Sequence, residues 1–264
     1  MRDTYYIYSM KKIVLSFDDS REDFYTRVFP LLKKYNTPAT LNVISGFVNG
    51  TAKMNMPSAD NKAMMSSQVV ECQQSGLVEI ACHGAVHDNT KEGVLRNIED
   101  MKAWGVNVEG IGFASPTSIL TKKNIHTTGI DSLVEEGTLS YVRSGIRTRR
   151  EGLMYSAFTF IDSKIHSGYL FYRLNKRCII GKTLPVIIPS VAINSYHTIA
   201  QVKKLIAKMH DDEAVILNFH SVLQKGDTGY GKDKFYWEED RFDKLLKKLV
   251  SDVSIKVCTT KELL

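Results

Sequence analysis

Cysteine is scarce in this chain of 264 residues, which has only four. Cys72, Cys82, Cys178 and Cys258 are dispersed and form no CxxC pair. Zinc-finger frameworks and thioredoxin-type redox motifs need closely spaced cysteines, so the sequence excludes both. A reducing compartment fits this pattern, which still leaves disulfides open.

Long apolar runs are also lacking. No segment approaches the ~20 apolar residues of a membrane span, and residues 1–10 are polar and rich in tyrosine, without the apolar core of a signal peptide. We therefore expect a cytoplasmic, soluble protein with no membrane span.

Charge of one sign is only slightly in excess. The net charge of +6 comes from 35 Lys and Arg against 29 Asp and Glu, which falls short of a nucleic-acid footprint, so no nucleic-acid partner is expected. The densest basic cluster reads more readily as a solvated loop than as a phosphate clamp; it consists of Arg143, Arg147, Arg149 and Arg150.

Glycine-rich nucleotide loops of the GxGxxG and GxxxxGK types do not follow the first apolar run, Ile13–Leu15. What the chain does contain is an alternation of about seven or eight short apolar runs with segments of helical spacing. Such alternation predicts a parallel α/β sheet, either closed as a barrel or open and doubly wound. We expect one domain over 1–264, with an elaborated excursion at about 144–182 that mixes aromatic and basic residues.

Two adjacent carboxylates follow the first predicted strand, in Ser16-Phe17-Asp18-Asp19-Ser20. A buried ionised carboxylate without a partner costs several kcal/mol, so a pair needs a cation, a shared proton or open water. The structural alternative is an N-cap for the helix expected from Asp23, and the doublet alone does not separate the two.

Histidines follow two other predicted strands. His83 and His87 are four residues apart, a spacing that puts both imidazoles on one face of a helical turn, where they could grip one metal ion. Two histidines often share this spacing by chance. One Asp with two His would give a facial metal site; the second Asp would then serve as general base, and His220, after a later strand, as general acid.

These residues resemble three motifs of the polysaccharide deacetylase family, the NodB-homology group or carbohydrate esterase family four. The matching stretches are Ser16–Asp19, the HxxxH of His83 and His87, and Leu217–His220. The resemblance implies a distorted (β/α)7 barrel that removes N- or O-acetyl groups from sugars. It further implies Asp18 as base, Asp19, His83 and His87 as ligands of a divalent metal, most simply zinc, and His220 as acid.

The resemblance also suggests how substrate is held. Leu217 would help line the pocket for the acetyl methyl, and a backbone N–H near Ser115, Pro116 and Thr117 would stabilise the oxyanion. The family's third motif has an Arg before its Pro, where this chain has Ala114, and Arg143 is a candidate source of that charge. The family's Asp that orients the acid has no clear counterpart; Asp162 is a candidate by position only, and a surface Asp is the plainer reading.

Three functions compete on these grounds. The leading one is a metal-dependent deacetylase acting on an intracellular sugar precursor of surface-polysaccharide synthesis, with the sugar nucleotide- or lipid-linked to suit the basic excess. The second is a related amidohydrolase, such as a deformylase, on a non-acetyl substrate. The third is a non-catalytic carbohydrate-binding relative that keeps the barrel.

Overall fold

The structure is a computed structural model that describes residues 10–146 and 149–264. The main sheet has nine strands, and all of their pairings are parallel. They are β1 (Lys11–Phe17), β2 (Ala39–Val43), β3 (Val78–Cys82), β4 (Ile111–Ala114), β5 (Leu139–Ser144), β6 (Ile187–Pro189), β7 (Val191–Ala192), β8 (Ala214–Phe219) and β11 (Ile255–Cys258). A separate parallel pair consists of β9 (Ser221–Leu223) and β10 (Tyr236–Glu238).

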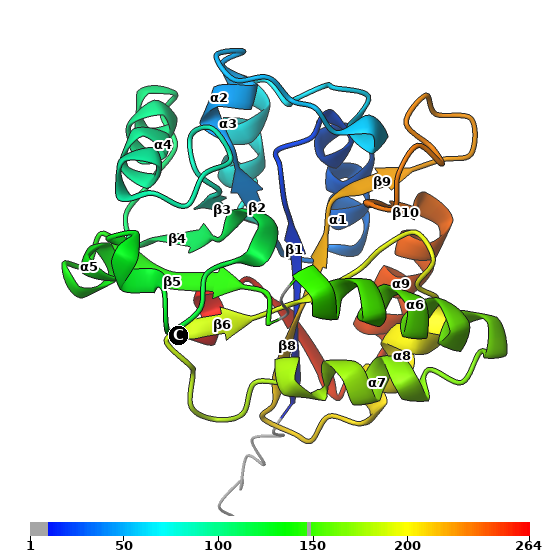
Figure 1. Ribbon diagram of the computed structural model, residues 1–264. Helices are drawn as coiled ribbons and strands as arrows, with labels where there is room; N and C mark the ends of the chain where they lie inside the picture. The colour runs from blue at the N-terminus through cyan, green and yellow to red at the C-terminus, as the bar shows by residue number, and fades with distance from the viewer. Residues whose placement is uncertain (1–9, 147–148) are drawn as a thin grey trace, which may run out of the picture.

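The sheet curves into a nearly closed barrel, in the order β6-β5-β4-β3-β2-β1-β8-β7 (Figure 1). Only Ser190 separates β6 from β7; β6 pairs with β5 and β7 pairs with β8, so one extended segment bridges the two ends of the sheet. Counting that segment once gives seven barrel positions, with β11 added beside the first half of β1. The predicted (β/α)7 barrel is confirmed.

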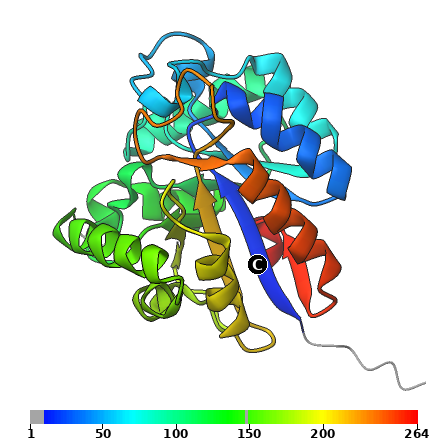
Figure 2. The ribbon, with the colours of Figure 1, turned by 90° about the vertical axis from the view of Figure 1, so that its right-hand side faces the viewer.

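Helices connect the strands and cover the outside of the barrel (Figures 1 and 2). They are α1 (Phe29–Tyr35), α2 (Ser45–Val48), α3 (Ser66–Gln74), α4 (Lys91–Ala103), α5 (Ile130–Glu135), α6 (Arg149–Ile165), α7 (Tyr169–Asn175), α8 (Ile199–Ala207) and α9 (Glu239–Ser251). A π-helical turn (Phe24–Val28) precedes α1, and 3-10 turns occupy Pro57–Ala59, Pro116–Ser118, Ile125–Thr127, Lys176–Cys178 and Lys261–Leu263. Side-chain caps start two of the helices: Thr90 accepts from the Gly93 N–H, and Thr198 from the Gln201 N–H.

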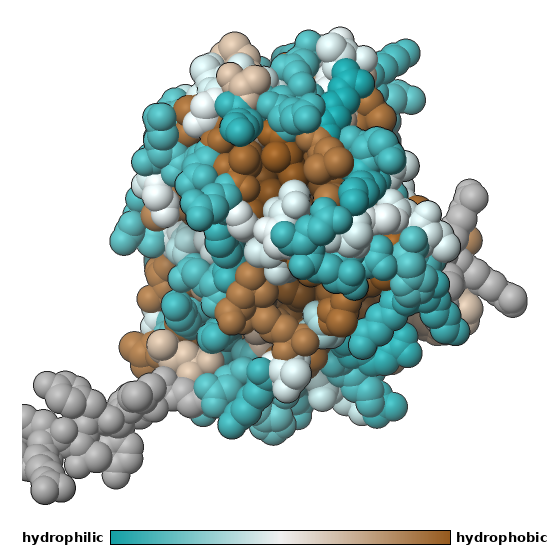
Figure 3. All heavy atoms as spheres, turned by 90° about the vertical axis from the view of Figure 1, so that its left-hand side faces the viewer, coloured by the Kyte–Doolittle hydropathy of each residue, from teal (hydrophilic) through white to brown (hydrophobic). Residues whose placement is uncertain are grey.

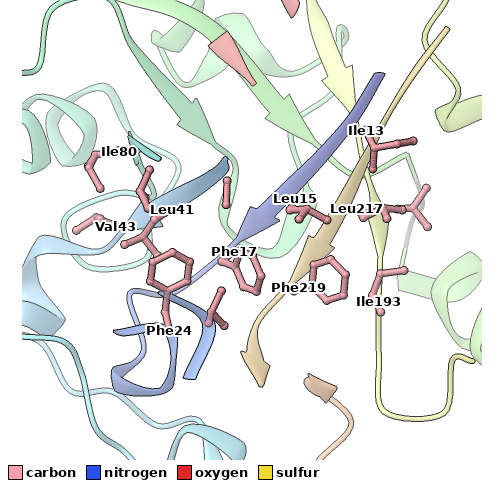
Figure 4. Close-up of a cluster of buried hydrophobic side chains, with 14 of the residues drawn as sticks. Ile13, Leu15, Phe17, Phe24, Leu41, Val43, Ile80, Ile193, Leu217 and Phe219 are labelled. Atoms are coloured by element: carbon pink, nitrogen blue, oxygen red, sulfur yellow. The ribbon is translucent and has the colours of Figure 1, made fainter. Parts of the chain in front are cut away.

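Side chains along the strands alternate between two faces, as in any pleated backbone, apart from a register irregularity between β4 and β5. Ile13, Leu15 and Phe17 of β1 point outward, beside Leu217 and Phe219 of β8, into the apolar layer under the helices (Figure 4). A smaller set faces the barrel interior: Val14, Ala81, Tyr141, Ile180, Ile188, Ala214, Ile216 and Cys258. Because of this alternation, only every second residue of a strand can contribute its side chain to the barrel interior at the carboxyl end.

The segment predicted as an excursion, 144–182, holds α6 and α7. α6 packs on α7 and α7 on α8, and together they form the outermost layer on one side of the barrel (Figures 1 and 2). Seen from the side of α4 and α5, the surface is mostly polar, with apolar areas between polar side chains (Figure 3). None of the helices among the described residues combines the length and apolar character needed to cross a bilayer.

Candidate metal and catalytic site

Five strand ends deliver polar side chains to the carboxyl end of the barrel interior. Every second side chain of a strand points to the same face, so Asp18, two residues after the inward-facing Ser16, also points into the barrel. On their own strands the residues in the corresponding inward positions are Asn42, His83, Arg143 and Asn218. All five are buried. Because the strands are parallel, these side chains meet at one end of the barrel, where barrel enzymes build their active sites.

Asp19, His83 and His87 converge within this end of the barrel. Their ligand atoms all lie within 4.8 Å of one another. The Asp19 Oδ1 is 3.5 Å from the His83 Nε2 and 3.7 Å from the His87 Nε2. The structure thus brings together the three residues that the sequence suggested as metal ligands.

The convergence does not arise from a helical turn, so that part of the sequence argument was wrong. His83 directly follows β3, and residues 83–90 form a loop. Gly84 and His87 have positive φ angles of 75° and 63°, and these two left-handed residues fold the loop back so that His87 returns beside His83. Asp19 also has positive φ, 78°, which turns its side chain away from the direction that Asp18 takes.

A hydrogen bond orients the His83 ring and determines which of its two nitrogens could bind a metal. The His83 Nδ1 lies 2.7 Å from the Ala114 carbonyl, an acceptor, so the Nδ1 carries the proton and the Nε2 keeps its lone pair toward Asp19. Two imidazole nitrogens and one carboxylate oxygen suit Zn²⁺ and other divalent transition metals. The residues present therefore fit a divalent cation.

Arg21 holds the metal-facing carboxylate and was missed by the sequence analysis. Its Nε and Nη2 both donate to the Asp19 Oδ2, at 3.0 and 2.7 Å, which leaves the Oδ1 turned toward the imidazoles. Its Nη1 donates to the hydroxyls of Ser58 and Ser221. Burial alone would raise the pKa of Asp19, but His83 and Arg21 hold the pKa well below its usual value. The signal available in the sequence was an Arg two residues after the doublet.

Three donors hold Asp18 beside this cluster, where its Oδ2 lies 3.9 Å from the His83 Nε2. The Arg143 Nη2 lies 2.5 Å and the Asn42 Nδ2 2.8 Å from its Oδ1, and the Asn218 Nδ2 lies 2.9 Å from its Oδ2. Burial would raise the pKa of Asp18, but Arg143 and, after it, the histidines outweigh burial and lower the pKa to about 2. Asn42 and Asn218 also escaped the sequence analysis; both are inward-facing polar residues in otherwise apolar strands.

Arg143 is not part of a solvated basic loop, as the cluster of arginines first suggested. It is 1% exposed and, besides Asp18, its Nη1 donates to the Ser190 hydroxyl. It therefore supplies a positive charge to Asp18 from β5, in place of the Arg absent at Ala114. Arg147 of the same cluster lies outside the described residues, as do the side chains of Arg149 and Arg150.

His220 follows β8 on the same face as Asn218. Its ring lies 5.2 Å from that of Phe235, and its Nδ1 is buried and has no hydrogen-bond partner among the described residues. Burial, with Arg21 and His83 adding to it, lowers the pKa of His220 to about 4. Asp162 does not orient this ring, and it is not at the surface either: it is buried and accepts the N–H groups of Leu170 and Phe171 at the start of α7.

The stretch Ser115–Thr117 offers fewer donors than expected. The Ser115 N–H is taken by the Arg143 carbonyl at 2.7 Å, and Pro116 has no N–H. Thr117, with φ of 55°, is therefore the member of this stretch whose N–H is left as a candidate oxyanion donor. The Ser115 hydroxyl instead donates to Asn89, whose amide donates to the Pro116 carbonyl, which ties the β4 loop to the His87 loop.

Leu217 does not reach the site. It points outward from β8 into the apolar layer under the helices, beside Ile13 and Leu15 (Figure 4). The adjacent Asn218 takes the inward position and contacts Asp18. The prediction that Leu217 lines an acetyl pocket was wrong, because it disregarded the two-residue period of the strand.

Asp23 lies behind His220 and gives a pH-dependent prediction. It accepts the Ser221 hydroxyl and the Val222 N–H, and burial raises its pKa from 3.8 to about 6 despite those bonds. Because the folded state holds this proton more tightly, its stabilising contribution is present below pH 4 and is lost as pH rises to 6. Urea unfolding of Asp23→Asn should show a stability advantage over wild type that grows by about 3 kcal/mol between pH 4 and 7. A difference that stays constant with pH would contradict this.

Taken together, a parallel β/α barrel with an Asp-His-His cluster and a separate carboxylate at the carboxyl ends of its strands is typical of barrel hydrolases. The family model described as polysaccharide deacetylase matches residues 7–111, which include Asp18, Asp19, His83 and His87 but neither Arg143 nor His220. Over this stretch, which is fewer than half of its residues, the chain is similar to the polysaccharide deacetylase family.

Three proteins of known identity are similar to the chain over stretches of different length. The poly-beta-1,6-N-acetyl-D-glucosamine N-deacetylase of Escherichia coli K12 is 36% identical over 78 residues, which cover 28% of this chain and 12% of that protein. The deacetylase domain of BpsB from Bordetella bronchiseptica is 20% identical, with a TM-score of 0.40 over 50% of this chain and 62% of that one. A CE4 family pseudoenzyme from Bacillus anthracis is 12% identical, with a TM-score of 0.48 over 97% of this chain and 66% of that one. At these TM-scores neither solved structure bears on the roles of single residues.

Proposed function

We propose that the chain is a metal-dependent hydrolase that removes an acetyl group from an N- or O-acetylated sugar. The observation that supports it is the convergence of the Asp19 Oδ1 with the Nε2 atoms of His83 and His87, beside a second carboxylate, Asp18, that is hydrogen-bonded to Arg143. A divalent cation, for which we propose zinc, would supply Lewis-acid polarisation of the acyl carbonyl and a lowered pKa for bound water.

The residues of the chain would divide the proton transfers between them. As a water oxygen attacks the acetyl carbonyl, Asp18 accepts the proton that the water loses. The Thr117 N–H donates to the oxyanion that develops on the carbonyl oxygen. When the C–N or C–O bond to the sugar breaks, the proton that Asp18 accepted passes by way of the ring of His220 to the departing amine or alkoxide. The products are acetate and the free amino or hydroxyl sugar.

The substrate we propose is a nucleotide- or lipid-linked sugar precursor for surface polysaccharide. Both linkages carry phosphate, which the positive net charge of the chain would attract. A cytoplasmic location is part of the proposal, and the four cysteines, all free and buried, fit a reducing compartment.

A second candidate function is favoured by the surroundings of Asp18. Both of its oxygens are engaged, by Arg143, Asn42 and Asn218, so the carboxylate is less available to take a proton. A non-catalytic sugar-binding relative would keep such a barrel and its cluster. A third alternative is a deformylase, which would release formate instead of acetate.

Acetate release from N-acetylglucosamine oligomers by zinc-loaded protein tests the proposal, with formate release from N-formyl analogues measured in parallel. Asp18→Asn should keep one zinc per chain and lose hydrolysis by ~10²-fold or more, the range for a general base. Zinc loss in that variant would mean that Asp18 is a ligand. Sugar and zinc binding without acetate or formate release in wild type would favour the non-catalytic alternative.

A further inference from the structure

Helix α6 is amphipathic in the opposite sense to the other long helices. Its buried positions, from Tyr155 on, are largely polar: Tyr155, Thr159, Asp162 and Ser163. Its exposed positions carry six large apolar side chains, each 44–69% exposed: Leu153, Met154, Phe158, Phe160, Ile161 and Ile165. In α9, by contrast, the buried residues are Phe242, Leu245, Leu246 and Leu249. We refer to the six exposed residues as the α6 apolar face.

The polar contacts of α6 lock this orientation. The Asp162 carboxylate accepts from the Ser167 hydroxyl, the Phe171 N–H and the Gln201 amide, and so joins α6 to α7 and α8. The Gln201 amide also donates to the Thr159 carbonyl at 2.8 Å. Rotating the helix to bury its apolar side chains would leave these buried polar groups without partners, at a cost for each group. These polar contacts therefore hold the α6 apolar face toward the outside of the molecule.

The apolar face forms one continuous stripe. Met154, Phe158, Ile161 and Ile165 follow the i, i+4, i+7, i+11 spacing of a single helix face, and Leu153 and Phe160 widen it. Single exposed apolar residues are ordinary, but contiguous apolar patches mark interaction surfaces. Figures 1 and 2 show α6 on the outside of the molecule, beyond the barrel.

Charge identifies the kind of partner. Gly152–Lys208, which spans α6 to α8, contains eight Lys and Arg but a single acidic residue, the buried Asp162. This excess of seven positive charges exceeds the net charge of the whole chain, +6. Exposed basic side chains sit among the aromatics: the Lys164 Nζ lies 5.0 Å from the Phe160 ring centroid, and Arg173 lies 5.9 Å from that of Tyr169 on α7.

We propose that the α6 apolar face lies on the surface of an anionic lipid bilayer, parallel to the membrane, with the basic residues of α6–α8 contacting lipid phosphates. An apolar helix face bordered by Lys and Arg is the composition of interfacial helices. A second copy of this chain fits less well, because a two-fold interface would set the same basic surface against itself. The proposal concerns a surface outside the catalytic cluster and does not depend on the proposed activity.

Vesicle co-sedimentation tests it, with full-length protein and vesicles of phosphatidylcholine alone or with 30% phosphatidylglycerol as the probe. We expect binding to the anionic vesicles, weakened by raising NaCl from 0.1 to 0.5 M. Phe158→Ser/Ile161→Ser should lower the partition coefficient about tenfold or more, since two apolar side chains of the buried helix face are lost. Lys164→Glu/Arg173→Glu should lower it to a similar degree.

Matched controls separate this surface from general stickiness. Val253→Ser removes an exposed apolar residue elsewhere (93% exposed), and Arg96→Glu/Lys102→Glu on α4 makes the same change in net charge away from α6 (Figure 1). Neither should alter binding. The proposal is overturned if wild type ignores anionic vesicles, if the control variants weaken binding as much as the α6 variants, or if sedimentation velocity shows a dimer that Phe158→Ser/Ile161→Ser dissociates.

Discussion

Replacing Arg143 with methionine is expected to lower the free energy of unfolding by about 3–5 kcal/mol, the largest stability loss we predict for a single substitution. Arg143 and Asp18 are 1% and 5% exposed, and their closest atoms are 2.5 Å apart. Removing the guanidinium leaves a buried carboxylate with two neutral amide donors, Asn42 and Asn218, which do not balance its charge. Urea unfolding at pH 7, with and without zinc, measures the loss.

A double-mutant cycle isolates the pair. Asp18→Asn in the Arg143→Met background removes the stranded charge, so the double variant should be more stable than Arg143→Met alone, with a coupling of about 1–3 kcal/mol. Arg27→Met is the control, because the ion pairs of Arg27 with Asp227 and Glu239 are partly exposed. This substitution should lower the free energy of unfolding by about 1 kcal/mol or less. Equal losses for Arg143→Met and Arg27→Met would show that the buried pair does not stabilise the fold.

A parallel α/β sheet was predictable from short-range patterns, and the resemblance to the polysaccharide deacetylase family implied the closed barrel and the three metal ligands. Apolar runs of strand length alternate with helical spacing, and the polar residues that carry the cluster come directly after runs such as Ile13–Leu15 and Val78–Cys82. Parallel strands bring their carboxyl ends together whatever the helices between them do. Asp19 and His83 could therefore be grouped without knowing the loops, whereas His87 joins them through the fold of the loop that contains Gly84.

The features that the sequence did not predict depend on which face of a strand a residue occupies and on contacts between residues far apart in the chain. Leu217 and Asn218 are neighbours, and only the strand period tells which faces the barrel interior. Arg143 was both one of several loop arginines and a candidate source of positive charge; its contact with Asp18, 125 residues earlier, depends on the position of β5 in the barrel. Arg21 finds its partners Ser58 and Ser221 through loops that have no periodic pattern.

Helix α6 shows that the spacing of apolar residues does not by itself predict which face of a helix is buried. Its apolar residues at helical spacing would ordinarily indicate a helix packed on the core. The structure reverses this, because Asp162 and Thr159 bind polar groups of α7 and α8 that lie under the helix. Periodicity gives a helix and its two faces, but which face is buried depends on what the neighbouring helices offer.

Substituting His83 by alanine is expected to abolish stoichiometric zinc binding and, with it, hydrolysis. His83 is buried, its Nδ1 is tied to the Ala114 carbonyl, and its Nε2 faces Asp19, so its removal leaves Asp19 and His87 as the two remaining members of the cluster. Losing one of three ligands should reduce affinity by more than the 10–100-fold typical of losing an outer hydrogen-bond partner. Calorimetric titration with zinc and metal content after dialysis measure the effect.

The controls for this variant follow from the same geometry. His126→Ala removes an exposed histidine, 62% exposed at its side chain, and should leave one zinc per chain. His83→Gln keeps most of the volume and a donor for the Ala114 carbonyl, so its thermal unfolding in EDTA should match wild type while its zinc affinity falls. Wild-type zinc content in both His83 variants would place the metal elsewhere, and the proposed deacetylase would lose the cluster on which its chemistry depends.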